Sequence, residues 1–305
     1  MGFNAKCELK RFLEEDIGKG DITSKLIKQQ QITAKIISRE ETIVAGVNFA
    51  KQIFALKGCR VKVVTNNGKK SKVNQTILEV RGNAYAVLSC ERTALNLLSR
   101  MCGIANKTNH LAKILRKTRS RSKLFATRKT APGLRQFDKI AVEIGGGHKH
   151  RMSLDEMIMI KDNHISIESL EVLIKKAKKT RKKIEVEVEN KNDAIIAAKM
   201  GVGIIMLDNF TPTQITSVMK KLENLKLLKN VKLEASGRIN EKNISKYGKT
   251  GVDMISVGGI TNSVKGVALS LEISLIASIL SIANLALSAI FFGTVTSYFS
   301  FSKES

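Results

Sequence analysis

The sequence predicts an α/β protein with two domains and an extra hydrophobic tail at the C-terminal end, and three patterns carry this prediction. Residues 1–104 mix short strand-like and helical segments, as a mixed α/β domain does. Residues 105–272 repeat an apolar strand and then a helix about every two dozen residues, which is typical of a parallel α/β domain. Residues 273–302 contain no charged side chain. We therefore divide the chain into 1–104, 105–272 and 273–305.

Composition and charge restrict the possible functions. With 305 residues, 43% hydrophobic and 26% charged, the chain has the composition of a globular protein that can bury a full core. The formal net charge of +25 suggests nucleic acid as a partner. Aromatic residues make up only 5%, however, Trp is absent, and much of the positive excess lies in helical stretches such as 175–179. We therefore expect anionic ligands in general and no nucleic acid.

Cysteine usage and the N-terminus indicate a cytoplasmic protein. Cys7, Cys59, Cys90 and Cys102 have no metal-ligand spacing, and no apolar leader precedes them. We expect four reduced thiols and no thiol catalysis, because none of them stands in a Cys-His arrangement.

The first domain is expected to begin and end with amphipathic helices. The second of these, residues 91–103, should stop at Gly103. Arg92 falls in its first turn, where a cation opposes the helix dipole, so it is either a surface residue or a ligand-facing arginine. The expected helices are 9–15, 46–54 and 91–103, and the expected strands are 33–39, 60–65, 77–80 and 84–88.

The second domain is expected to alternate strands and helices along its whole length, which favours a barrel, complete or incomplete, over an open sheet. Neither a dinucleotide-binding nor a Walker-type glycine motif is present, so those nucleotide sites lose their support. The expected strands are 124–127, 157–160, 184–189, 204–207, 231–235 and 254–257, and the expected helices are 106–117, 167–179, 193–200, 212–222 and 241–249.

Basic side chains stand at the carboxyl ends of the first strands of this domain, where parallel α/β barrels bind their ligands. Arg128 and Lys129 follow one strand, and Lys161 follows the next. They belong to a basic stretch, residues 127–165, whose forked and point-charge donors suit a small ligand with several negative charges.

Carboxylates and glycines stand at the ends of the later strands. Glu187 and Asp208 end neighbouring strands, which suits Mg²⁺-bound phosphate or a developing cation. Internal salt bridges to Lys129 and Lys161 are a compatible alternative. The strand ends at Ser236-Gly237 and Gly258-Gly259 offer backbone amides to a phosphate.

Nine motifs resemble those of one known family. They are EDIGKGDIT from Glu15, ERTALNLLSRMCGIA from Glu91, TRKTAPGLR from Thr127, GGGHKHR from Gly145, IKDNH from Ile160, EVEVEN from Glu185, MLDNF from Met206, EASG from Glu234 and GVDMISVGGIT from Gly251. The chain resembles the quinolinate phosphoribosyltransferases, also called carboxylating nicotinate-nucleotide pyrophosphorylases, over residues 5–273.

The resemblance implies a fold and a reaction. The fold is an N-terminal α/β sandwich followed by an open, TIM-like α/β barrel, in a homodimer or homohexamer whose sites are shared between subunits. The reaction transfers phosphoribose from PRPP to quinolinate with loss of pyrophosphate and CO₂, and it gives nicotinate mononucleotide for NAD biosynthesis with Mg²⁺ as cofactor.

The resemblance also implies residue roles. The residues expected to bind quinolinate are Arg92, reaching in from a neighbouring subunit, and Arg128, His150, Arg151 and Lys161. The expected catalytic residues are Lys129, Glu187 and Asp208, of which the two carboxylates hold Mg²⁺ through PRPP. The residues expected to bind the phosphate of PRPP are Lys129, Ser236, Gly237, Gly258 and Gly259.

Three positions depart from the family pattern. Lys149 replaces an asparagine, Arg238 replaces the second glycine of a Ser-Gly-Gly turn, and Asn262 replaces a histidine. The last two belong to the phosphate end, so PRPP handling is the part of the function they affect. The alternatives are a paralogue of the same fold with another acceptor, as in the molybdenum-associated ModD-like proteins, and a catalytically weak anion-binding relative. Lys161 in IKDNH favours quinolinate.

The tail is the largest departure. The uncharged run from Ile273 to Phe299 is long enough to span a bilayer as a helix, so membrane contact through 273–301 is one expectation. Its serines and Asn284 dilute the hydrophobicity, which makes a packed helical hairpin or a frame-altered tail the other reading.

Overall fold

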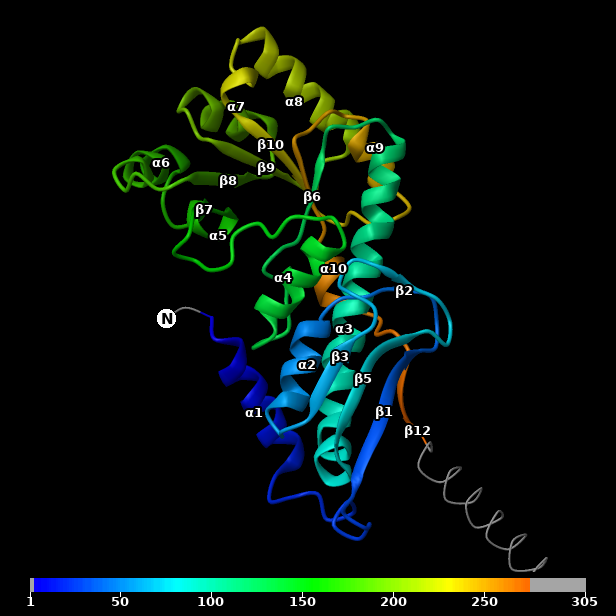
Figure 1. The fold of residues 1–305 in the computed structure, drawn as a ribbon. Helices are drawn as coiled ribbons and strands as arrows, with labels where there is room; N and C mark the ends of the chain where they lie inside the picture. Colours follow the sequence, from blue (N-terminus) through cyan, green and yellow to red (C-terminus); the bar gives the residue numbers. More distant parts are fainter. Residues whose placement is uncertain (1–2, 275–305) are drawn as a thin grey trace, which may run out of the picture.

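Two sheets organise the chain, an antiparallel sheet of four strands and a parallel sheet of six strands (Figure 1). The computed structural model describes residues 3–274. One long helix, α3 (Ala84–Lys117), runs along both parts and joins them. The predicted α/β class, a mixed N-terminal domain followed by an open barrel, is confirmed.

The antiparallel sheet lies in the N-terminal part, in the strand order β12, β1, β5, β3. Its strands are β1 (Gln31–Ser38), β3 (Arg60–Val63), β5 (Thr76–Asn83) and β12 (Leu269–Ser274), and β2 (Thr42–Ile43) pairs separately with β4 (Lys70–Ser71). Helices α2 (Val47–Ala55) and α3 pack on this sheet, and α1 (Ala5–Ile17) packs on those two helices. The result is a sheet with a layer of helices on one face.

Helix α3 corrects three predictions. Residues 84–88 are its first turns and not a strand, and residues 91–103 and 106–117 form one helix with no stop at Gly103. Gly103 serves packing instead, because a Cβ there would lie 2.1 Å from the carbonyl oxygen of Lys265. Asn83 caps the helix by accepting the backbone N–H of Tyr85. Arg92 is therefore well inside the helix, and the conflict with the helix dipole that the sequence suggested is absent.

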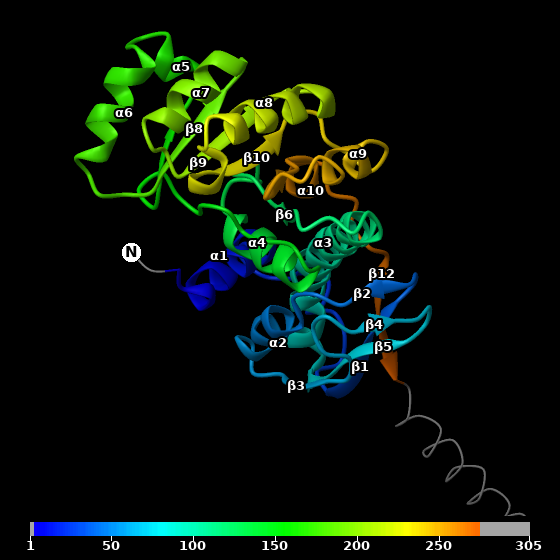
Figure 2. The ribbon, with the colours of Figure 1, turned by 90° about the horizontal axis from the view of Figure 1, so that it is seen from above.

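The parallel sheet has the strand order β6, β11, β10, β9, β8, β7, so β6 and β7 are its edges within the described residues. Its strands are β6 (Lys123–Phe125), β7 (Ile158–Ile160), β8 (Ile184–Val188), β9 (Ile204–Asp208), β10 (Lys232–Ser236) and β11 (Met254–Ser256). The outer helices are α6 (Leu170–Lys178), α7 (Lys191–Lys199), α8 (Pro212–Asn224) and α9 (Ile244–Gly248) (Figure 2). All six strands were predicted, with boundaries shifted by one or two residues.

Three short helices that the sequence did not predict stand near the strand ends: α4 (Arg135–Ile144), α5 (Asp162–Ile165) and α10 (Gly259–Asn262). The side chains of β8 show how the barrel is filled. Val186 and Val188 are buried on one face of the strand, whereas Glu185 and Glu187 share the other face because successive side chains alternate. Carboxylates thus enter the barrel interior.

The end of the described chain returns to the N-terminal sheet. Strand β12 pairs antiparallel with β1, with Leu271 opposite Ile36 and Glu272 opposite Lys35. Residues 269–272 therefore belong to the first sheet, although the sequence placed them in the second domain. The predicted tail beyond Ser274, and its membrane contact, lie outside the described residues. Among residues 3–274, no helix is long and apolar enough to cross a bilayer.

Candidate active site

A cavity of about 350 Å³ opens at the carboxyl ends of the parallel strands. Eight of the predicted site residues line it: Arg128, Lys129, His150, Arg151, Lys161, Glu187, Asp208 and Ser236. Because the strands run parallel, their carboxyl ends meet at one edge of the sheet, and the side chains that follow each strand converge there.

Two arginines form the basic side of the cavity. The Nε of Arg128 is buried and has no hydrogen-bond partner within residues 3–274. The guanidinium of Arg151 donates to the carbonyl of Met157 at 3.1 Å. Burial, and then the charge of Arg128, lower the pKa of Arg151. A buried unpaired donor beside a second cation is costly, and an anionic ligand that accepts from both would remove that cost.

Lys161 and Glu187 are joined across the cavity. The ammonium of Lys161, at the end of β7, donates to the carboxylate of Glu187, near the end of β8. The alternative of an internal salt bridge is therefore correct for this pair. The side chain of Lys161 stays 37% exposed and that of Glu187 13% exposed, and both line the cavity, so a ligand can still reach them.

The predicted phosphate end is built around a glycine turn. Asp208 accepts a hydrogen bond from the side-chain amide of Asn209 at 2.6 Å. Gly237 has φ +95°, and a Cβ on it would lie 2.5 Å from the backbone nitrogen of Asn209. Only glycine fits here, both for its backbone angle and for this close approach. Gly237 thus lets the β10 end lie directly against the β9 end.

The other predicted phosphate residues flank the cavity and do not line it. A Cβ on Gly258 would lie 3.0 Å from Cδ of Lys129, which places this glycine beside the lysine side chain. The carbonyl of Gly259 accepts a hydrogen bond from Lys107 Nζ at 2.6 Å. Lys107, on α3, thereby fixes the start of α10.

The three departures from the family pattern take different places. Lys149 forms an ion pair with Glu143 at 2.7 Å. Arg238 is exposed and has φ +50°, a left-handed angle that costs a non-glycine residue about 1 kcal/mol. Asn262 is exposed at the end of α10 and accepts a hydrogen bond from Ser263. Arg238 is thus the departure that strains the backbone.

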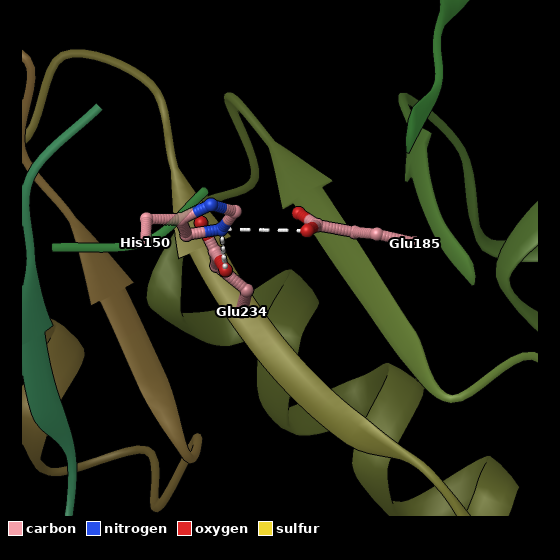
Figure 3. Close-up of side chains that lie close together, drawn as sticks. All are labelled: His150, Glu185 and Glu234. Carbon is pink, nitrogen blue, oxygen red and sulfur yellow. Dashed lines mark hydrogen bonds and ion pairs between the residues drawn. The ribbon is translucent and has the colours of Figure 1, made fainter. Parts of the chain in front are cut away.

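His150 lies at the floor of the cavity and points toward two buried carboxylates (Figure 3). Its Nε2 is 3.1 Å from Glu234 Oε2 and 3.3 Å from Glu185 Oε2. Its Nδ1 accepts the backbone N–H of Arg151 at 2.8 Å. Both ring nitrogens therefore face protein groups, and direct contact of His150 with quinolinate stays a prediction.

The cluster of His150, Glu185 and Glu234 shares its protons. Burial lowers the pKa of His150, but hydrogen bonds and charges from Glu185 and Glu234 outweigh burial and raise this pKa to about 9. Burial also raises the pKa of Glu185, whose Oε2 lies 3.3 Å from His150 Nε2 and whose two oxygens have no other partner within the described chain. Because the amide of Arg151 occupies Nδ1, the extra proton is better placed on Glu185 than on the ring. With the extra proton on either residue, the three side chains together carry one net negative charge.

The same three side chains offer metal-ligand atoms within 4.8 Å of one another. A metal bound at Nε2 of His150 would require the ring proton to lie on Nδ1. Nδ1 faces the N–H of Arg151, which is itself a donor. The hydrogen-bonded cluster therefore fits the structure better than a metal site.

Arg92 lies apart from this cavity. It is exposed on α3 and is absent from the residues that line the cavity of its own chain. The structure thus leaves its predicted role, which requires a second subunit, as a prediction.

Sequence reasoning did not assign six residues of the cavity wall to the site: Ala126, Thr127, Met159, Met206, Glu234 and Ser256. Glu234 precedes Ser236 by two residues, so the alternation of strand side chains would have placed it on the same inner face. Ser256 ends β11 and donates to Glu234. Alternation along each strand was the signal that could have found them.

Comparisons with known proteins agree along most of the chain. The model of the quinolinate phosphoribosyl transferase C-terminal domain matches residues 104–272, and that of the N-terminal domain matches residues 21–102. A probable carboxylating nicotinate-nucleotide pyrophosphorylase from Methanocaldococcus jannaschii is 42% identical over 87% of this chain and 95% of its own length. One from Bacillus subtilis is 37% identical over 88% and 92%. The solved nicotinate-nucleotide pyrophosphorylase of Francisella tularensis has a TM-score of 0.82 at 36% identity and covers 88% of this chain and 96% of its own.

Proposed function

The chain belongs to the quinolinate phosphoribosyltransferase family, and we propose that its barrel cavity carries out the family's reaction. The protein is a carboxylating nicotinate-nucleotide pyrophosphorylase: it transfers phosphoribose from PRPP to quinolinate and forms nicotinate mononucleotide, pyrophosphate and CO₂. The observation that supports the site is that Arg128, whose buried Nε has no hydrogen-bond partner in residues 3–274, lines one cavity together with Arg151 and Lys161.

Quinolinate has two adjacent carboxylates, and the basic side of the cavity is suited to them. Arg128 supplies a free donor, and Arg151 supplies a second guanidinium that its own carbonyl contact holds in place. Lys161 is already paired with Glu187, so it contributes by exchanging part of that pairing for a ligand carboxylate. We call Arg128, Arg151 and Lys161 the dicarboxylate clamp.

Glu187 and Asp208 face the ribose end of the reaction. Breaking the bond from C1′ to pyrophosphate leaves positive charge on the ribose, and carboxylates near C1′ stabilise that charge. Carboxylate oxygens are also the ligands that Mg²⁺ prefers, so both residues fit a Mg²⁺ ion that arrives with PRPP and neutralises its pyrophosphate. Lys129, beside Gly258, supplies a further cation for the phosphates.

Decarboxylation then needs little from the protein. Once the ring nitrogen bonds to C1′ it becomes cationic, and this charge stabilises the electron pair that CO₂ leaves on the neighbouring carbon. That carbon then takes up a proton from solvent, which gives nicotinate mononucleotide. The clamp holds the ring and keeps water from the departing carboxylate. A covalent nucleophile is not required.

Assembly completes the proposal. The exposed position of Arg92 on α3 is compatible with a homo-oligomer in which this arginine reaches the cavity of a neighbouring subunit.

The decisive experiment incubates purified protein with Mg²⁺, quinolinate and PRPP and follows nicotinate mononucleotide by chromatography. The proposal expects one pyrophosphate and one CO₂ for each mononucleotide. Absence of product with quinolinate, together with product from another aromatic acceptor, would identify a same-fold paralogue. Binding of quinolinate without product from any acceptor would identify an anion-binding relative.

A further inference from the structure

Lys139, on helix α4, is a buried lysine that the reaction does not use directly. Its side chain is fully buried. Its ammonium donates to the carbonyl oxygens of Lys149 and Arg151, the latter at 2.6 Å. These two carbonyls flank His150 on both sides, so a single charged group holds the backbone of the whole turn.

A buried ammonium is expensive, which makes its retention informative. Burial and then the charge of Arg135 lower the pKa of Lys139 to about 8. Within residues 3–274 it forms no ion pair, so backbone carbonyls are what compensate the buried charge. A methionine would fill the same volume without this cost, yet it could not hold the two carbonyls.

The turn that Lys139 holds has an unfavourable backbone. His150 has φ +55°, a left-handed angle that a residue with a side chain adopts only when its surroundings enforce it. This angle directs the His150 ring toward Glu234 and places the Arg151 guanidinium at the cavity wall. Without the ammonium, the two carbonyls would lose their donor and the turn would lose its main restraint.

We propose that Lys139 is the positioning residue of the dicarboxylate clamp, since its two carbonyl contacts fix the turn that aims Arg151. This inference rests on the proposed function, because it assigns Arg151 to quinolinate. Arg135 lies one helical turn earlier on α4 and supports the same arrangement. It donates to the hydroxyl of Thr130 at 3.2 Å and to the carbonyl of Met152 at 3.0 Å. The face of α4 that carries both residues therefore supports the turn from two points.

The test compares Lys139→Met with Lys149→Met. Lys149 belongs to the turn itself, but its side chain reaches only Glu143, so its removal is the matched control. Quinolinate binding is measured by calorimetry without PRPP, and the KM values of both substrates are measured in the full reaction. Lys139→Met should weaken quinolinate binding by about tenfold to a hundredfold, the cost of misplacing binding groups by about 1 Å. The KM for PRPP should stay within about twofold.

If Lys139→Met weakens the binding of quinolinate and of PRPP equally, its role is a general structural one and the proposal is overturned. The proposal is also overturned if Lys149→Met weakens quinolinate binding as much as Lys139→Met does. If Lys139→Met does not fold, Lys139→Gln serves instead, because its shorter amide keeps a donor. Its quinolinate binding should fall by a smaller factor, and wild-type binding would overturn the proposal. Calorimetry measures quinolinate binding without turnover. A wild-type protein that binds quinolinate but forms no product would therefore refute the proposed function without refuting the role of Lys139.

Discussion

Replacing Arg128 by methionine, which puts a methyl group where the buried Nε lies, should weaken quinolinate binding and, at the same time, stabilise the folded protein. Both effects follow from the buried Nε, which has no partner in the described chain. When quinolinate binds in the cavity that Arg128 lines, the guanidinium gains a charged acceptor without giving up a hydrogen bond to the described part of the protein. When the arginine is absent, the folded state no longer carries an unsatisfied donor, and Arg151 no longer faces a second guanidinium.

The magnitudes follow from these contacts. A hydrogen bond between charged partners contributes about 1.5–3 kcal/mol, so the dissociation constant should rise by roughly 10- to 150-fold. An unsatisfied buried donor costs about 1–3 kcal/mol, and part of that amount should return as a higher free energy of unfolding. The two changes therefore have opposite consequences, which a general loss of structure cannot produce.

The assay combines calorimetric titration with quinolinate and urea unfolding of the same preparations. Arg121→Met is the control, because this arginine is exposed shortly before β6 and outside the cavity. It should change neither quantity. Wild-type affinity in Arg128→Met would refute the clamp, and reduced stability would refute the reasoning about the unpaired donor.

Three further predictions follow. Asp208→Asn should lower kcat by much more than it raises the dissociation constant for quinolinate, since its charge acts at C1′; a change confined to quinolinate binding in steady-state and titration data would contradict this role. Mixing inactive Arg92→Ala with inactive Asp208→Asn should restore activity if subunits share sites, whereas mixtures as inactive as their components would exclude sharing. The proton that His150 shares with Glu185, for which the pKa of His150 is raised from 6.5 to about 9, gives stability that is complete below pH 6.5 and lost as pH rises toward 9. The pKa of Lys139, lowered from 10.5 to about 8, gives stability that returns above pH 8. Urea unfolding should therefore show a minimum in the free energy of unfolding between pH 8 and 9, and Lys139→Met should lack the alkaline rise.

The barrel strands were predictable because each combines an apolar run with a polar residue at its carboxyl end. The long helix was not, since Gly103 looks like a helix stop in a local reading. Gly103 instead stands inside the helix because its backbone packs against the carbonyl of Lys265, which is far away in the sequence. Strand β12 was missed for a related reason, because it pairs with β1, the first strand of the chain, from which it is far away in the sequence.

The cavity residues were predictable to the extent that they end strands. Arg128, Lys161 and Asp208 were found by that rule, and the family motifs added the turn with His150 and Arg151. The supporting residues were not found, because their roles depend on contacts between elements. Nothing local distinguishes Lys139 from the many surface lysines of this basic chain.

Helix α4 links the proposed dicarboxylate clamp to the proposed phosphate end of the cavity. Asp138 is fully buried and accepts two hydrogen bonds from Arg100 on α3, each at 2.8 Å. Arg100 also donates to the carbonyl of Thr261, whose hydroxyl donates to the carbonyl of Lys129. Since Lys139 on the same helix holds the other side of the cavity, the groups for both substrates share one support. Bond formation between quinolinate and C1′ requires the reacting atoms to be placed with an error well below about 1 Å. A common support maintains that alignment better than two independent loops could.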